Sequence, residues 1–310
     1  MLETVELSKS FKGKTVVDNV NLYLERGESV GLLGPNGAGK STTISMISSL
    51  LVPSQGDVRL YGKSIVKNPQ EIRKVLGVVP QDIALYEELS AYENLVFFGR
   101  IYRLSKTTLE HKIQEVLEIV GLRDRQKELI KTYSGGMKRR INIAAALLHN
   151  PQIVIMDEPT VGIDPQSRNH ILETVKLLNR EKGTTVLYTS HYMEEVEQLC
   201  NRMYIMDHGK VIASGTKEEL GRILSSEDTI LLQLDGYNEA VLASIRAIES
   251  VRQVEETVQG LKLIVTKQSR VLSAIVQCAE CHGVQVNNVH VQTPSLEDVF
   301  LHLTGRTLRD

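Results

Sequence analysis

The first two thirds of the chain alternate short apolar runs with longer stretches in which apolar residues recur at helical spacing. Polar and apolar positions alternate over 20–24, which predicts a strand that a turn at Arg26-Gly27 closes. Short apolar runs follow at 30–33, 75–79, 153–156 and 186–188. Runs of this kind are typical of buried parallel strands. The helical stretches between them end near Gly121 and Gly183. The pattern predicts an α/β domain with a parallel sheet, interrupted by a largely helical insert at about 91–149.

The pattern changes at about residue 228, after an expected hairpin at 207–210. From there the sequence predicts strand, helix, strand, strand, helix and strand, at 230–234, 240–248, 252–258, 261–265, 271–281 and 284–291. This β-α-β-β-α-β order is that of a ferredoxin-like α+β domain. A last helix is expected to begin at Ser295, in a capping box. We therefore expect a first domain at 1–220, a linker at 221–227 and an accessory domain at 228–306.

Composition narrows the class of protein. A length of 310 residues allows about two domains. The net charge of −2 gives no electrostatic basis for binding nucleic acid, and we expect no such partner. Three cysteines cannot form a disulfide framework, which favours a reducing compartment. The acidic residues of 1–6 predict no export signal, and the longest apolar run, 143–148, is far short of the ~20 residues of a membrane span.

A phosphate-binding loop follows the apolar run at 30–33. The segment Gly34-Pro35-Asn36-Gly37-Ala38-Gly39-Lys40-Ser41-Thr42 matches G-x-x-x-x-G-K-[ST] and precedes a helical stretch. A polyphosphate needs several converging N–H donors, which glycines and a helix N-terminus supply. Lys40 is expected to reach the β- and γ-phosphates and Ser41 to hold Mg²⁺. The alternative, a glycine-rich turn that binds no ligand, is disfavoured because strand, loop and helix occur together.

Two carboxylates, Asp157 and Glu158, directly follow the apolar run at 153–156. Open α/β sheets bind ligands at this end of their strands. Because adjacent strand residues point in opposite directions, the two acids can act separately. Asp157 is expected to orient the Mg²⁺ shell, and Glu158 to act as general base on the water that attacks the γ-phosphate. An acidic surface turn is the alternative.

With five further features, residues 2–215 resemble the nucleotide-binding subunit of an ATP-binding cassette (ABC) transporter. Tyr133-Ser134-Gly135-Gly136-Met137 is similar to the signature sequence, Gln81 to the Q-loop residue, Gly162-Ile163-Asp164-Pro165 to the D-loop, His191 to the switch histidine and Phe11 to the aromatic that stacks on adenine. The resemblance implies a P-loop NTPase core with an antiparallel β subdomain and a helical subdomain. It implies ATP and Mg²⁺ as cofactors, and catalytic roles for Glu158, His191, Lys40 and Gln81. Gln81 would also sense Mg²⁺.

The resemblance also implies partners. Ser134, Gly135 and Gly136 precede a predicted helix and so offer a second anion-binding N-terminus. In the family this segment, with Asp164 nearby, contacts ATP held by the P-loop of a second copy in a head-to-tail dimer. A separately encoded integral-membrane permease is the other implied partner, which places the chain at the cytoplasmic face of a bacterial membrane. For Phe11 simple packing is the alternative, and for His191 a structural role.

Two departures from the usual motif narrow the branch of the family. Tyr133 and Met137 replace Leu and Gln in the signature, and Lys138-Arg139-Arg140 follows. This string, and the ending 295–306, resemble the drug-resistance group of bacterial exporters, which pair with type-2 ABC permeases. The implied function is ATP-driven efflux of a drug, antibiotic or similar amphipathic compound. The basic trio is equally consistent with a solvated helix face. The apolar residues of the last helix are expected to dock on the accessory domain.

Two other functions compete with this interpretation. A soluble ABC ATPase acting on ribosomes or nucleic acid is disfavoured because the chain holds one cassette and no heptads. A non-hydrolysing regulator is disfavoured by the presence of both Glu158 and His191. The segment 278–282 matches the haem-attachment pattern C-x-x-C-H, but haem is not expected on an amphipathic helix of a chain without an export signal.

Overall fold

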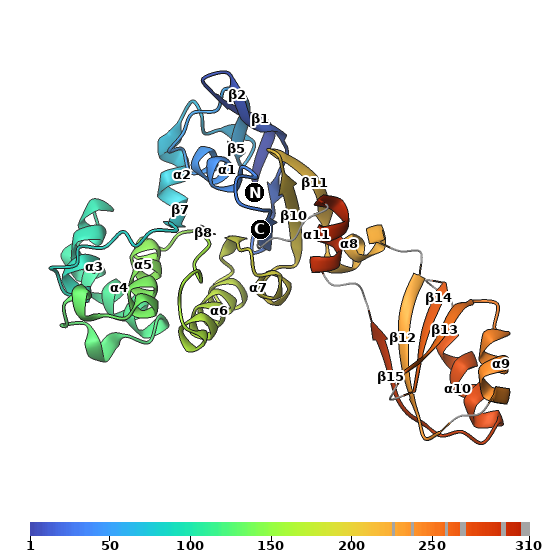
Figure 1. Ribbon diagram of the computed structural model, residues 1–310. Coiled ribbons are helices and arrows are strands. Elements are labelled where there is room, and N and C mark those ends of the chain that lie inside the picture. The colour runs from blue at the N-terminus through green and yellow to red at the C-terminus, as the bar shows by residue number, and fades with distance from the viewer. Residues whose placement is uncertain (225–226, 237–238, 258–259, 267–270, 293–295, 305–310) are drawn as a thin grey trace. The chain divides into compact units, whose positions relative to one another are not determined.

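The computed structural model describes residues 1–310 except 225–226, 237–238, 258–259, 267–270, 293–295 and 305–310. The described residues form two compact units (Figure 1). The first unit is Met1–Lys217 together with Leu303 and Thr304, and the accessory unit is Glu218–His302.

A six-stranded sheet forms the centre of the first unit, with strand order β11-β10-β4-β9-β8-β7. Its strands are β4 (Ser29–Leu33), β7 (Leu76–Val79), β8 (Ile153–Asp157), β9 (Thr185–Thr189), β10 (Arg202–Asp207) and β11 (Lys210–Gly215). Neighbouring strands are parallel except β11, which forms a hairpin with β10. Every residue of β4, β8 and β9 is buried, because helices and a second sheet cover both faces. The predicted parallel sheet is confirmed.

A second, antiparallel sheet packs against the first around one shared apolar core. Its strands are β1 (Leu2–Phe11), β2 (Lys14–Val20), β3 (Tyr23–Leu24), β5 (Gln55–Leu60) and β6 (Lys63–Ser64). The prediction of one strand over 20–24 is wrong, because β2 ends at Val20 and β3 begins at Tyr23. The Thr4 hydroxyl interrupts the ladder, donating to the Val20 carbonyl (2.9 Å) and accepting from the Leu22 N–H (2.7 Å).

The helices of the first unit are α1 (Lys40–Ile47), α2 (Pro69–Val75), α3 (Ala91–Ile101), α4 (Lys106–Ile119), α5 (Gly135–Leu147), α6 (Pro165–Arg180) and α7 (Met193–Leu199). The helices α3, α4 and α5 contact one another and form the expected helical insert (Figure 1). Ser90, Ser105, Ser134 and Asp164 set the starts of α3, α4, α5 and α6, since each side chain accepts a hydrogen bond from the backbone three residues on.

The accessory unit has its own apolar core. Its elements are β12 (Glu227–Leu234), α9 (Glu239–Arg246), β13 (Val251–Thr257), β14 (Gly260–Thr266), α10 (Val271–Cys281) and β15 (Val286–Gln292). They have the predicted β-α-β-β-α-β order and form one antiparallel sheet, β13-β14-β12-β15.

Helix α8 (Lys217–Leu224) lies where the sequence placed the end of the first domain and the start of the 221–227 linker. A last helix, α11, spans Leu296–Thr304, and its Val299 and Phe300 are fully buried. The expected cap residue Ser295, Gln259 of the expected turn, and residues 305–306 lie outside the described residues.

Candidate functional site

A cleft opens where β4 ends and α1 begins. Residues 36–42 line it, together with Val16, Gln81 and Glu158. The structure thus gathers most of the predicted phosphate-binding loop, and three of the four predicted catalytic residues, around one cavity. These residues lie at the carboxyl ends of the parallel strands, where α/β sheets bind ligands.

Two glycines of the loop have backbone conformations that side chains rarely adopt. Gly37 has φ of 82° and Gly39 has φ of 102°. A Cβ at Gly39 would stand 2.9 Å from the Val16 carbonyl oxygen, so the loop runs close beneath β2. The glycines therefore keep backbone N–H groups accessible in a space where other residues would not fit.

Lys40 is the first residue of α1, and it is 5% exposed. Its Nζ donates to the carbonyls of Gly34 (2.7 Å) and Pro35 (3.2 Å) and lies 3.6 Å from Oε1 of Glu158. Burial lowers the pKa of Lys40, and the charges of Glu158 and Asp157 oppose that effect. The side chain connects the loop to the acidic end of β8.

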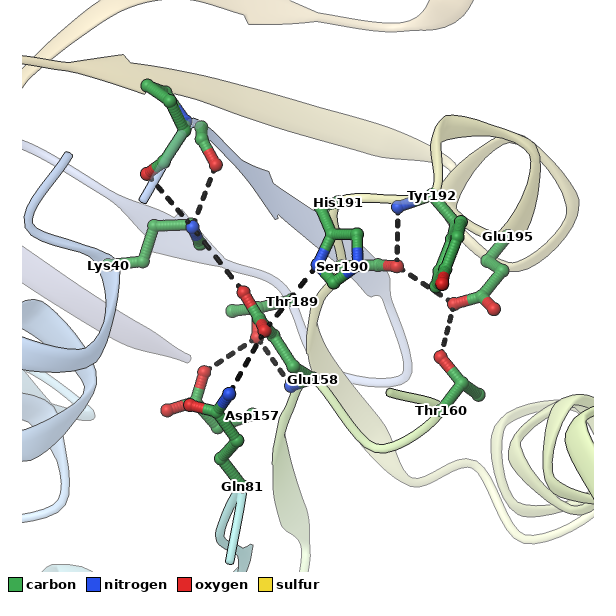
Figure 2. Close-up of polar contacts among 12 residues, drawn as sticks. Lys40, Gln81, Asp157, Glu158, Thr160, Thr189, Ser190, His191, Tyr192 and Glu195 are labelled. Atoms are coloured by element: carbon green, nitrogen blue, oxygen red, sulfur yellow. Dashed lines mark hydrogen bonds and ion pairs between the residues drawn. The ribbon is translucent and has the colours of Figure 1, made fainter. Parts of the chain in front are cut away.

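Glu158 is the point on which the predicted catalytic groups converge (Figure 2). Its Oε2 lies 3.3 Å from Nε2 of Gln81 and 3.5 Å from Nδ1 of His191, and its Oε1 faces Lys40. The residue is 7% exposed and has φ of 47°, a left-handed conformation that is uncommon outside glycine. Such a conformation costs energy and persists only where the surrounding structure maintains it, as the Glu158 N–H bond to the Thr189 hydroxyl does here.

Thr189, at the end of β9, holds both acids, and sequence reasoning gave it no role. Its hydroxyl accepts from the Glu158 N–H and donates to Oδ1 of Asp157, each at 2.8 Å. Asp157 and Thr189 are partners in the pairing of β8 with β9. The signal that would have identified Thr189 is this register, which a single sequence does not show.

Arg139, in the basic trio of α5, holds the segment around Gln81. It is 5% exposed, and its guanidinium donates to the carbonyls of Pro80 (2.6 Å) and Gln81. Asn142, one turn further along α5, accepts from the Ala84 N–H at 3.3 Å. The solvated-face hypothesis for the trio is therefore wrong at Arg139. Lys138, by contrast, forms a partly exposed ion pair with Glu87.

The signature and D-loop residues do not line this cleft. Ser134 caps α5, and Asp164 caps α6 by accepting from the Ser167 N–H at 2.9 Å. That hydrogen bond holds the pKa of Asp164 below its usual value. A Cβ on Gly136 would stand 2.1 Å from Oγ of Ser167, so the two helix N-termini lie side by side.

Phe11 also stands outside the cleft lining, at the end of β1. The residue is 45% exposed, and Nζ of Lys9 lies 5.3 Å from its ring centroid. The ring is therefore free to contact a flat ligand near the β1–β2 hairpin.

The sequence of this chain is similar to those of known proteins. Residues 17–161 match the family model described as ABC transporter. The linearmycin resistance ATP-binding protein of Bacillus subtilis (strain 168) is 51% identical over 312 aligned positions, covering 100% of both chains. The protein belongs to the ABC transporter family. This ABC ATP-binding subunit is also 36% identical to the daunorubicin/doxorubicin resistance ATP-binding protein of Streptomyces peucetius, over 100% of this chain and 94% of that protein.

Among solved structures, the ABC subunit is similar to a dimeric ATP-binding cassette in a post-hydrolysis state bound to ADP and Pi. The TM-score is 0.64 with 29% identity, over 70% of this chain and 98% of the other. The subunit therefore binds and hydrolyses ATP. Both of these relatives are ATP-binding proteins of resistance systems, which does not favour the alternative of an ATPase acting on ribosomes. In the described part of the chain, no helix has the length and apolar character of a membrane span.

Proposed function

We propose that this ABC subunit is the ATPase of a bacterial exporter that moves a drug, antibiotic or similar amphipathic compound through a separate permease. The observation that carries the proposal is the meeting of Lys40, Gln81 and His191 on the Glu158 carboxylate beside the phosphate-binding loop. The names of its relatives, which include linearmycin and daunorubicin/doxorubicin resistance proteins, support the class of compound.

Within the site, Gly34 to Thr42 wrap the phosphates of ATP with backbone N–H groups and the N-terminus of α1. Lys40 neutralises the β- and γ-phosphate oxygens. Glu158 accepts the proton of the attacking water, and Gln81 and His191 hold that carboxylate and the water in line. Lys40, Gln81 and His191 all lie next to the Glu158 carboxylate, which supports the proposal that they act together at one site.

The residues around the cleft fit a magnesium ion. Ser41 lines the cleft with Gln81 and Glu158, and Asp157, which directly precedes Glu158 in the chain, is 8% exposed. Mg²⁺ prefers oxygen ligands of this kind and usually shares them with phosphates. Ser41, Asp157 and Gln81 would hold the ion, which would supply positive charge to the phosphate oxygens.

A second copy of the chain completes the site in this proposal. Ser134, Gly135, Gly136 and Asp164 stand at the adjacent N-termini of α5 and α6 and do not line the cleft of their own chain. Helix N-termini bind anions. In a head-to-tail dimer they would contact the γ-phosphate held by the partner's loop, while Phe11 stacks on adenine. The similar solved cassette is dimeric.

The helical insert offers a surface for the permease. Tyr86, Phe97 and Ile101 are 50%, 39% and 61% exposed, and the rings of Tyr86 and Phe97 pack edge to face with centroids 4.8 Å apart. Tyr86 lies in the segment that Arg139 and Asn142 attach to α5. Exposed apolar clusters mark contact sites. This surface supports docking at the cytoplasmic face of the membrane.

Co-isolation with a membrane partner tests the proposal. The tagged chain, expressed in its native cells, is purified from detergent-solubilised membranes. We expect a protein with several apolar segments to co-purify, and Ile101→Glu to reduce its yield by about tenfold or more, since a charge replaces an interface residue. Ile212→Glu, at an isoleucine that is 38% exposed on β11, is the matched control and leaves the yield unchanged. Recovery of ribosomal proteins in place of a membrane partner would contradict the exporter assignment.

A further inference from the structure

A buried carboxylate lies next to the catalytic groups without belonging to them. Glu195, on α7, is 3% exposed. Its Oε2 accepts hydrogen bonds from the hydroxyls of Thr160 (2.7 Å), Tyr188 (2.9 Å) and Ser190 (2.8 Å). Figure 2 shows the Thr160 and Ser190 hydroxyls meeting this oxygen from two different turns of the chain.

The donors are placed next to the residues that carry the chemistry. Thr160 stands two positions after Glu158, in the turn that follows β8. Ser190 directly precedes His191, in the turn that follows β9. One carboxylate oxygen therefore joins the backbone turn of the general base to the backbone turn of the switch histidine.

Further contacts fix the histidine turn and extend to the D-loop helix. Oγ of Ser190 accepts from the Tyr192 N–H at 2.9 Å, which closes the turn around His191. The guanidinium of Arg168, in the first turn of α6, lies 4.3 Å from the Tyr192 ring centroid, and its Nε is 3.4 Å from Oε1 of Glu195. Glu195 thus connects the segments after β8 and β9 with the helix that Asp164 begins.

The charge of Glu195 matters to this arrangement. A buried carboxylate is expensive to desolvate, and three hydroxyl donors together with a guanidinium offset that cost. Burial and the negative charge of Glu195 raise the pKa of Tyr188, so the tyrosine keeps the proton that it donates. Loss of the charge would weaken all of these contacts at once, because they share one acceptor group.

We propose that Glu195 is a positioning residue of the ATPase, which keeps the turns bearing Glu158 and His191 in fixed relative geometry. It acts through Thr160 and Ser190 and does not touch the nucleotide. The inference rests on the proposed catalytic roles of Glu158 and His191. Misplacing a catalytic group by about 1 Å can cost on the order of 100-fold in rate, so such a clamp affects turnover more than binding.

Steady-state ATP hydrolysis by the full-length chain tests this inference. Glu195→Gln keeps the shape of the side chain and removes its charge. We expect kcat to fall about 10- to 100-fold, with KM and the affinity for a fluorescent ATP analogue changed by less than about threefold. Glu194→Gln, at the exposed neighbouring glutamate, is the matched control and keeps wild-type kcat. Wild-type kcat in folded Glu195→Gln would overturn the inference, as would a loss of nucleotide affinity as large as the loss of kcat.

Two further variants cover the cases in which Glu195→Gln destabilises the fold or the base assignment fails. Ser190→Ala removes one donor from the clamp, and it should lower kcat in the same direction with unchanged nucleotide affinity. If Glu195→Gln does not yield folded protein, wild-type kcat in Ser190→Ala overturns the inference. Glu158→Gln separates the two proposals: unchanged turnover in that variant contradicts the proposed mechanism, whereas lost turnover there with wild-type kcat in Glu195→Gln contradicts only the positioning role.

Discussion

At the residue scale, the site depends on buried charges whose partners come from distant parts of the chain. Glu158 meets Lys40, Gln81 and His191, and each of these follows a different strand of the parallel sheet. Removing one partner of a buried pair costs about 3–5 kcal/mol because it leaves the other charge uncompensated. Substitutions at the site therefore need a folding control beside every activity measurement.

His149, which lies away from the site, is a partly buried ionisable group whose burial should make the stability of the fold depend on pH. Its Nε2 lies 3.1 Å from the Leu76 carbonyl oxygen, and its ring stacks on Tyr102 with centroids 3.9 Å apart. Within the described residues, its buried Nδ1 has no hydrogen-bond partner. Burial lowers the pKa of His149 below the usual 6.5, and the bond to Leu76 only partly opposes this.

Below about pH 6.5, His149 is therefore protonated more in the unfolded chain than in the folded chain. The free energy of unfolding then decreases as the pH decreases, until the pH reaches the pKa of His149 in the folded chain. We expect His149→Gln to remove up to about 1.4 kcal/mol per pH unit of this acid destabilisation. Urea unfolding at pH 7.5, 6.5 and 5.5 measures it, with His111→Gln at an exposed histidine as control. Equal slopes in the wild type and His149→Gln would show that the burial of His149 carries no such cost.

The residues of the site divide into those that the sequence predicted and those that only the structure shows. Lys40 lies in the phosphate-binding motif, Glu158 follows an apolar strand, and the family resemblance implied roles for Gln81 and His191; the structure brings all four together. The roles of Thr189 and Glu195 could not be predicted from the sequence. Their hydrogen-bond partners come from other elements, and only the folded structure shows which residues those are.

At the scale of elements, α5 connects two functional segments. Its N-terminus carries Ser134, Gly135 and Gly136, and Arg139, one turn later, holds the Pro80 and Gln81 carbonyls. We therefore expect a movement of α5 to reach the Gln81 segment through these direct hydrogen bonds. The two segments belong, in the proposed dimer, to different ATP sites.

Amide exchange measures this connection. Arg139→Met keeps the apolar stem and removes the hydrogen bonds to both carbonyls. We expect exchange at residues 81–84 to become about tenfold or more faster, since a buried hydrogen bond of this kind is worth about 1–3 kcal/mol. Lys138→Met, which removes only the ion pair to Glu87, should change exchange little, because surface pairs contribute about 0–1 kcal/mol. The same acceleration in both variants would show that Arg139 has no special role.

Local sequence patterns were sufficient to predict some of the strands and helices, but not all of them. The strands β4, β8 and β9 followed from continuous apolar runs, and α4 and α6 from helical spacing before a glycine. The alternation over 20–24 failed because the Thr4 hydroxyl, from β1, takes the place of ladder bonds there. A single sequence does not reveal a side chain that replaces backbone pairing from another strand.

At the scale of the whole molecule, the described residues form two units with separate apolar cores. The first unit holds every predicted catalytic residue. Its cleft collects half of the predicted ATP-binding groups, whereas Ser134, Gly135, Gly136 and Asp164 stand outside it. The phosphate-binding motif predicted the first group and the family resemblance implied the second, but neither showed that they would be separated within one chain. This separation is the structural reason to propose that two copies build each complete site.

Replacing Glu158 with Gln tests whether Glu158 activates water in an ATP site completed by a second copy. We expect kcat to fall by about 100-fold or more, the range expected for loss of a general base. We also expect Mg²⁺ and ATP to convert the variant from monomer to a stable dimer, measured by light scattering on the same sample. Turnover equal to wild type, or a variant that binds ATP and stays monomeric, would contradict this mechanism.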